Sequence, residues 1–281
     1  MNSVNKQVRN LLLAVVASSL LMACSEAPKL PSASDNVQLL PVSFWMDELG
    51  RERQVRLYLP PNYASSDKHY PVLYMHDGQN LFDDATSYAG EWGVDESLNE
   101  LAKNQGLELI VVGIDNGGDK RMNELSPWIN KRFGEAEGKG YMSFITEVVK
   151  PYIDTNFRTK AQREFTAIMG SSMGGLISHY AIHAYPQVFS KAGIFSPSYW
   201  YSQEVFTYTN AHRAASDARL YIVSGSEEGD GMIADMNKMQ RQLKEQGNPR
   251  ENTLFKTVQG GQHNEAFWRQ EFPEAIQWLF R

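Results

Sequence analysis

Short apolar runs alternate with amphipathic segments along residues 37–281 of this 281-residue chain. The runs predict strands at residues 37–45, 53–59, 71–76, 107–114, 164–169, 191–195, 219–224 and 254–258. Apolar residues at helical spacing predict helices at 94–104, 141–156, 173–185, 231–246 and 265–280, with a kink or an early end near Lys150 because Pro151 follows it. Strands that alternate with helices predict one α/β domain, with helices on both faces of a mainly parallel sheet.

The segment 167–176 joins a predicted strand to a predicted helix through a cluster of glycines. Within it, Gly170, Ser172 and Gly174 fit the G-x-S-x-G pattern of a nucleophile elbow, in which a strand turns sharply into a helix and exposes a serine. The glycines suit such a turn because side chains there would collide with the neighbouring strand and helix. In parallel α/β sheets functional residues gather at the carboxyl ends of the strands. Ser172 is therefore the candidate nucleophile.

A serine hydroxyl needs a base to take its proton, and the elbow pattern places the acid and then the histidine after the serine. His263 follows the last predicted strand on a glycine-rich loop, the place expected for the base. His179 and His183 lie on the elbow helix itself, and His212 lies in a polar loop with no strand end beside it. We therefore assign His263 as the candidate base.

The acid is expected in the loop after the preceding strand, where Glu227, Glu228 and Asp230 all occur. Spacing alone does not choose among these three carboxylates. An oxyanion hole needs two backbone donors, and the pattern places one at the residue after the serine, Met173. The other is expected in the loop after strand 71–76, at Gly78.

Composition excludes several other classes of function. The formal net charge is −6 and no basic cluster is present, so the sequence does not favour a nucleic-acid partner. His179 and His183 are four residues apart on a helix, but no carboxylate of the H-E-x-x-H kind lies between them. We expect neither a metal nor an organic cofactor.

The N-terminal residues predict export from the cytoplasm. Lys6 and Arg9 precede an apolar run at 11–22, as in a signal peptide over residues 1–23. Cys24, the single cysteine, follows Leu-Met-Ala, which resembles the lipobox of bacterial lipoproteins and predicts a lipid anchor at Cys24. Ser25 at the next position favours the outer membrane of the cell envelope by the same resemblance, facing the periplasm. Residues 24–36 are rich in Pro, Ser and Ala and predict a tether.

Five blocks of this sequence occur in order: His76-Asp77-Gly78-Gln79-Asn80-Leu81-Phe82, Glu124-Leu125-Ser126-Pro127-Trp128, Gly170-Ser171-Ser172-Met173-Gly174-Gly175, Ser196-Pro197-Ser198-Tyr199-Trp200 and Gly260-Gly261-Gln262-His263-Asn264-Glu265. Together they resemble the α/β-hydrolase family known as putative esterases, which includes esterase D, enterochelin esterases, feruloyl esterases and mycolyltransferases. The resemblance covers residues from about 40 to 281 and implies an α/β-hydrolase fold for the catalytic domain, residues 37–281. It also implies that Glu228 is the acid, because Gly225-Ser226-Glu227-Glu228-Gly229 matches the family's G-x-x-E-G run.

The expected activity is hydrolysis of a small carboxylic ester through an acyl-enzyme on Ser172. Trp128, Tyr199 and Trp200 are candidate residues for lining the substrate cleft. Two alternatives remain open at this point: an acyltransferase on the same fold, and a non-catalytic lipoprotein that binds a siderophore or a carbohydrate. Neither the ester nor the oligomeric state follows from the sequence.

Overall fold

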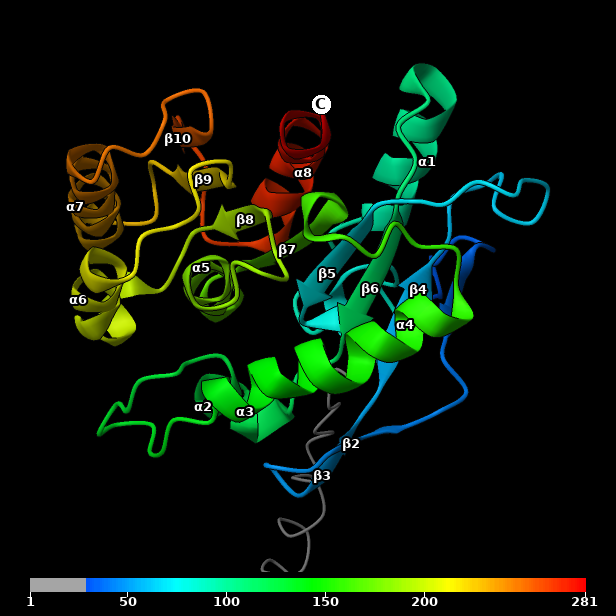
Figure 1. Cartoon of the computed structure of the whole chain (residues 1–281), viewed down its shortest axis with the longest axis horizontal. Coiled ribbons are helices and arrows are strands. Elements are labelled where there is room, and N and C mark those ends of the chain that lie inside the picture. Colours follow the sequence, from blue (N-terminus) through cyan, green and yellow to red (C-terminus); the bar gives the residue numbers. More distant parts are fainter. Residues whose placement is uncertain (1–28) are drawn as a thin grey trace, which may run out of the picture.

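An eight-stranded sheet runs through the computed structural model, which describes residues 29–281 (Figure 1). Its strands are β1 (Val37–Leu39), β4 (Val55–Tyr58), β5 (Val72–His76), β6 (Ile110–Ile114), β7 (Thr166–Ser171), β8 (Lys191–Phe195), β9 (Arg219–Gly225) and β10 (Thr253–Val258). Their order across the sheet is β1-β4-β6-β5-β7-β8-β9-β10. The pairs β1–β4 and β4–β6 are antiparallel and the rest are parallel. The predicted fold class is confirmed.

Helices cover both faces of this sheet (Figure 1). On one face lie α1 (Val94–Gln105) and α8 (Glu265–Phe280). On the other lie α5 (Met173–Ala184), α6 (Glu204–Ala211), α7 (Asp230–Glu245) and a continuous helical segment made of α3 (Gly138–Ser143), η3 (Phe144–Val149) and α4 (Lys150–Asn156). The shorter helices are α2 (Arg121–Glu124), η1 (Gly78–Asn80), η2 (Gly118–Lys120), η4 (Arg163–Phe165) and η5 (Tyr199–Tyr201).

Strand β5 is buried along its whole length because both faces of the sheet are covered there. In β5, Val72 and Tyr74 belong to the core on the α5 side, whereas Leu73 and Met75 belong to the core under α1 and α8. Successive side chains of a strand point to opposite faces, so a continuous apolar run fills both cores. This is the reason that β5 could be recognised from its sequence.

The first predicted strand, 37–45, is wrong as a single element. It divides into β1 and a separate strand β2 (Phe44–Met46), which pairs with β3 (Arg51–Arg53) in a two-stranded sheet. Pro41 lies in the break, where it has no N–H to give to a ladder. Helix α6 was not predicted, because its sequence is rich in β-branched and aromatic residues and it is helical where Val205 and Phe206 are buried against the core.

The predicted helix 141–156 neither ends nor breaks at Lys150. Helical structure runs from Gly138 to Asn156, and the stretch just before Pro151 is π-helical. A proline inside a helix lacks an N–H and its ring crowds the preceding turn. The wider π-helical turn at Phe144–Val149 accommodates the proline, so the helical segment continues past it.

Because β5 to β10 are parallel, the loops that follow them open at the same end of the sheet. This end carries Gly78, Ser172, Glu228 and His263. The fold therefore brings together residues that are up to 185 positions apart, from 78 to 263.

Residues 29–36, the end of the predicted tether, lie against the domain. Ser32 donates its backbone N–H to Asp83 at 3.1 Å, and Ser34 donates its own to Asp95 at 2.8 Å. The signal peptide and Cys24 lie outside the described residues. Within residues 29–281, no helix combines the length and the apolar character needed to cross a membrane.

Candidate active site

Ser172 lies at the turn between β7 and α5, with φ 57° and ψ −117°. A positive φ is uncommon for a residue with a side chain, and close contacts on both sides hold this one in place. A Cβ added at Gly170 would lie 2.9 Å from the carbonyl carbon of Gly174, and one at Gly175 would lie 2.7 Å from the Phe195 oxygen. The backbone N–H of Ser172 donates to Phe195 O at 2.9 Å. The glycines thus permit the sharp turn that raises Ser172.

The structure pairs His263 with one of the three candidate acids. His263 Nδ1 lies 2.7 Å from Glu228 Oε2, and the Glu228 side chain is fully buried. The other oxygen, Oε1, accepts from the Gly225 N–H at 2.6 Å and from the Ser196 hydroxyl at 2.7 Å. A buried carboxylate needs such donors, because an unpaired charge in the interior is costly. Glu228 is therefore fixed where it can orient the imidazole.

The other two carboxylates have different surroundings. Glu227 accepts a hydrogen bond from Gln262 Nε2 at 2.9 Å. Asp230 is the first residue of α7, where a negative charge favours the helix N-terminus. Among the three, only Glu228 contacts His263 in the described part of the chain.

The hydroxyl of Ser172 lies 3.1 Å from the Ser198 hydroxyl. Ser172 and His263 line one cavity, but no hydrogen bond joins them directly in the described chain. Edge-to-face packing against Trp268, with ring centroids 5.2 Å apart, holds the imidazole of His263 from the other side.

Gly78 and Met173 begin helices next to Ser172, η1 and α5 respectively. The first N–H groups of a helix have no partner within the helix, so they are free to bind an anion. Asp77, just before Gly78, is left-handed at φ 58°. A Cβ at Gly78 would lie 2.7 Å from Asp115 Oδ1, so only glycine fits there without a shift.

Two side chains from the loop after β6 clamp Asp77. Arg121 donates to both of its carboxylate oxygens, Nε to Oδ1 at 2.6 Å and Nη2 to Oδ2 at 2.8 Å, and Asn116 Nδ2 donates to Oδ1 at 2.6 Å. Burial alone raises the pKa of Asp77, but Arg121 and these hydrogen bonds outweigh it and lower the pKa below its ordinary value. Asp77 is therefore ionised, and the pair ties the Gly78 loop to the next loop of the site.

His76 is buried beneath the elbow. Its Nδ1 lies 2.8 Å from the hydroxyl of Tyr141, and a Cβ at Gly170 would come within 2.9 Å of its ring. Burial lowers the pKa of His76 to about 4, so the ring is neutral near pH 7. His76 supports the elbow and the Gly78 loop from below.

The cavity above these residues has a volume of about 620 Å³. Besides Ser172 and His263, its lining includes Asp119, Arg121 and Glu265, and Tyr88, which is 94% exposed. Burial, together with the charge of Asp77, raises the pKa of Glu265, whereas His263 and Arg121 lower it in part. The cavity carries more carboxylates than cations, and its guanidinium is already paired with Asp77.

The three aromatic residues expected in the substrate cleft do not line this cavity. Trp128 is buried against Tyr180 and Tyr208. Tyr199 is fully buried, and its hydroxyl lies 2.9 Å from His179 Nδ1. Trp200 is 53% exposed and stands beside Phe133. The geometry favours a packing role for Trp128 and Tyr199.

His179 and His183 stack on each other with ring centroids 4.8 Å apart. His179 Nε2 lies 2.9 Å from the Thr209 hydroxyl, and His183 Nδ1 lies 2.7 Å from the His212 carbonyl oxygen. Burial lowers the pKa of both rings. Residues 29–281 contain no cluster of three or more His, Cys, Asp or Glu side chains that could hold a metal ion.

Several residues of the site were not predicted. Ser196 donates to Glu228 and accepts from Trp268 Nε1 at 2.9 Å; it follows a predicted strand and begins one of the five blocks, but nothing local marks it as a partner of Glu228. Ser198 lies in the same block. Arg121 and Asn116 carry no local signal, because their partner Asp77 is about 40 positions away in the sequence.

Comparisons with known proteins agree on one family of esterases. A family model described as "Putative esterase" matches residues 46–279. The uncharacterized protein YbbA of Bacillus subtilis is 31% identical over 242 residues, which cover 81% of this chain and 92% of that protein. An endo-1,4-beta-xylanase/feruloyl esterase of Xylanibacter ruminicola is 25% identical over 85% of this chain and 31% of its own length. The enterobactin esterase FES of Shigella flexneri shares the fold, with a TM-score of 0.70 at 18% identity over 90% of this chain and 60% of that one.

Proposed function

The chain belongs to this esterase family and is a carboxylic ester hydrolase, and from that premise we propose that it works through a Ser172–His263–Glu228 triad. The observation that carries the proposal is the buried Glu228 carboxylate held 2.7 Å from His263, in the cavity that Ser172 also lines. Such a pair orients the imidazole and stabilises its protonated form.

In the first half-reaction the Ser172 hydroxyl leaves Ser198 and turns toward His263. Its oxygen attacks the carbonyl carbon of the ester while Nε2 of His263 takes the proton. The Nδ1–H of His263 donates to Glu228, which keeps Nε2 available as the acceptor. Collapse of the tetrahedral intermediate breaks the bond to the alkoxy oxygen, and the alcohol leaves with the proton from His263.

In the second half-reaction water replaces the alcohol. His263 takes a proton from the water, the hydroxide attacks the acyl-enzyme, and Ser172 leaves with the proton. In both steps the N–H groups of Gly78 and Met173 donate to the oxyanion, and each such donor is worth about 100- to 1000-fold in kcat in serine hydrolases.

The test is hydrolysis of short p-nitrophenyl esters by the wild type and the Ser172→Ala variant. We expect kcat to fall by about 10³- to 10⁶-fold, because the remaining triad cannot form the acyl-enzyme. A fluorophosphonate probe followed by mass spectrometry should place one covalent adduct on Ser172. Unchanged hydrolysis in Ser172→Ala, or an adduct on Ser198 instead, would refute the nucleophile.

For the substrate, we propose an ester whose parts in the cavity carry no large negative charge. Asp77, Asp119 and Glu265 line the cavity together with Arg121 and His263, and Arg121 is already paired with Asp77. The names of relatives include a feruloyl esterase and an enterobactin esterase, so the named substrates within this fold differ. A screen of neutral aryl and sugar esters against trianionic ferric catecholates decides between these classes, and higher kcat/KM on the ferric catecholates would contradict the proposal.

We also propose that the protein is held at an envelope membrane through lipid on Cys24, where the sequence resembles a lipobox. Labelled palmitate should enter the wild type in bacterial cells and should not enter Cys24→Ser. Equal labelling of both would refute the anchor.

A further inference from the structure

Strand β10 forms one edge of the large sheet, with β9 on its inner side and no neighbouring strand on its outer side among residues 29–281. The carbonyl oxygens of Asn252 and Val258 accept from Leu220 N at 2.8 Å and Ser226 N at 2.9 Å. Backbone groups alternate in direction along a strand, so these even-numbered positions face β9. The N–H and C=O groups of Thr253, Phe255 and Thr257 therefore face the open edge.

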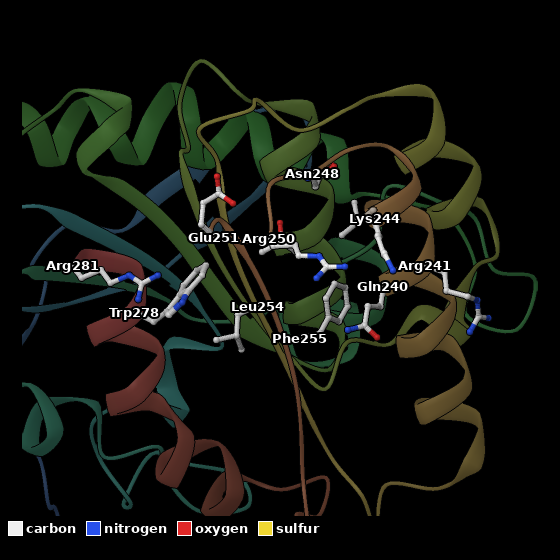
Figure 2. A pocket seen from close by; sticks show the side chains of 12 residues that line it. Gln240, Arg241, Lys244, Asn248, Arg250, Glu251, Leu254, Phe255, Trp278 and Arg281 are labelled. Carbon is white, nitrogen blue, oxygen red and sulfur yellow. The ribbon is translucent and has the colours of Figure 1, made fainter.

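A groove with a volume of about 590 Å³ follows this edge (Figure 2). Side chains from α7 form one wall and the end of α8 forms the other. The partly buried Phe255 packs against the core on the α7 side, whereas Leu254 and Trp278 pack against the core on the α8 side. The groove therefore straddles the edge strand, with an apolar surface on each side of it.

The rim of the groove is basic although the whole chain is acidic. Arg241, Lys244, Arg250 and Arg281 line it, against the single acidic side chain of Glu251 (Figure 2). None of these four cations forms an ion pair within the part of the chain that the structure describes. By contrast, the strand's own lysine, Lys256, is neutralised by Glu271 at 2.6 Å and Glu274 at 2.7 Å.

We infer that this groove binds an extended acidic peptide segment of another protein, which pairs with β10 as an added strand. The open N–H and C=O groups supply the backbone pairing and the four cations select negative side chains. A second copy of this chain is a poor occupant, because it would bring four more cations to the same edge. The inference does not depend on Ser172 or on the proposed triad.

The probe is a fluorescein-labelled octapeptide of alternating glutamate and valine, titrated with the full-length protein and followed by fluorescence polarisation. We expect saturable binding that weakens as salt is raised from 50 to 300 mM, because screening shortens the reach of the cations. The same peptide with lysine in place of glutamate should not bind. Two further peptides are N-methylated at every second residue, one on each alternate set of N–H groups. The peptide whose methyl groups replace the N–H groups that pair with β10 should lose binding, and the other peptide should keep it.

The matched variants are Arg241→Glu/Lys244→Glu in the groove and Lys131→Glu/Arg132→Glu on an exposed loop, each changing the net charge by the same amount. The groove variant should bind the peptide about 10-fold or more weakly, because two attractions between rim cations and peptide carboxylates become repulsions. The loop variant should bind as the wild type does. Ser172→Ala should also bind normally.

Four outcomes would overturn the inference. Equal binding of the glutamate and lysine peptides would show that charge does not select the ligand. Equal binding of both N-methylated registers would show a side-chain anion site without strand pairing. Absence of binding at 50 mM salt would show that the cations only protect the edge from aggregation. Sedimentation that shows a dimer dissociated by Arg241→Glu/Lys244→Glu would identify a second copy as the occupant.

Discussion

The Asp77–Arg121 pair shows how a single contact can hold the loop that carries Gly78, a proposed oxyanion donor. Asp77 has the left-handed backbone conformation that places the next residue, Gly78, at the start of η1 beside Ser172. Such a conformation persists only where the surroundings fix it. Here two hydrogen bonds from Arg121 and one from Asn116 fix it through the side chain.

Replacement of Arg121 by Gln should lower kcat by about 10- to 100-fold and change KM by less than about 3-fold. The variant would misplace the Gly78 N–H, and this proposed oxyanion donor acts mainly in the transition state. Steady-state kinetics on a p-nitrophenyl ester measures both constants. The control is Lys120→Gln, the neighbouring residue of η2, which is exposed. A change confined to KM would show instead that Arg121 binds the substrate.

The residues of the proposed triad differ in how far the sequence alone can single them out. Ser172 lies in a local pattern, and His263 lies at the end of the last strand, so both could be chosen from the sequence. Glu227, Glu228 and Asp230 are equivalent by spacing, and the fold separates them by the direction of each side chain. Arg121 and Ser196 act through partners far along the chain, which no local pattern specifies.

At the scale of elements, the site depends on how closely β9 approaches the loop after β10. A Cβ at Gly225 would overlap the backbone of Gly261, two residues before His263. Glu227 N also donates to Gly261 O at 2.9 Å, which links the acid loop to the histidine loop. Glycine at position 225 therefore sets the separation of the two loops that carry Glu228 and His263.

Substitution of Gly225 by Ala should push these loops apart and lower kcat by about 10-fold or more, because displacement of a catalytic group by even about 1 Å lowers activity. Overpacking should also lower the free energy of unfolding by about 1–3 kcal/mol. The control is Gly231→Ala in α7, where an added Cβ meets nothing within 4 Å and should stabilise the protein by about 0.5–1 kcal/mol. Normal kinetics in Gly225→Ala would show that the loop backbone can yield without moving His263.

The same reasoning explains which elements were predictable. Strands such as β8 and helices such as α8 carry their full pattern in their own residues, and their predicted bounds match the observed ones. Helix α6 and the π-helical turn before Pro151 depend on what the rest of the fold packs against them. Sequence periodicity contains the first kind of information and not the second.

At the scale of the whole molecule, three buried histidines link stability to pH. His76 lies under the elbow, and His179 and His183 lie on α5, where they contact Thr209 of α6 and the His212 carbonyl at its end. Burial lowers the pKa of His76 and of His183 to about 4, against about 6.5 in an unfolded chain. Below pH 6.5 the unfolded chain therefore binds more protons than the folded one.

It follows that the free energy of unfolding should be at its full value above pH 6.5 and should fall as the pH drops toward 4, by up to about 3 kcal/mol for each of His76 and His183. Urea unfolding followed by tryptophan fluorescence from pH 7.5 to 4.5 measures this slope. His183→Asn keeps an N–H donor for the His212 carbonyl and has no titrating group, so between pH 5 and 6 its slope should be smaller by about 1.4 kcal/mol per pH unit. The exposed His69→Asn should keep the wild-type slope. If His183→Asn also keeps the wild-type slope, His183 takes up its proton within the folded protein. The loss of stability at low pH then has to come from the other buried groups.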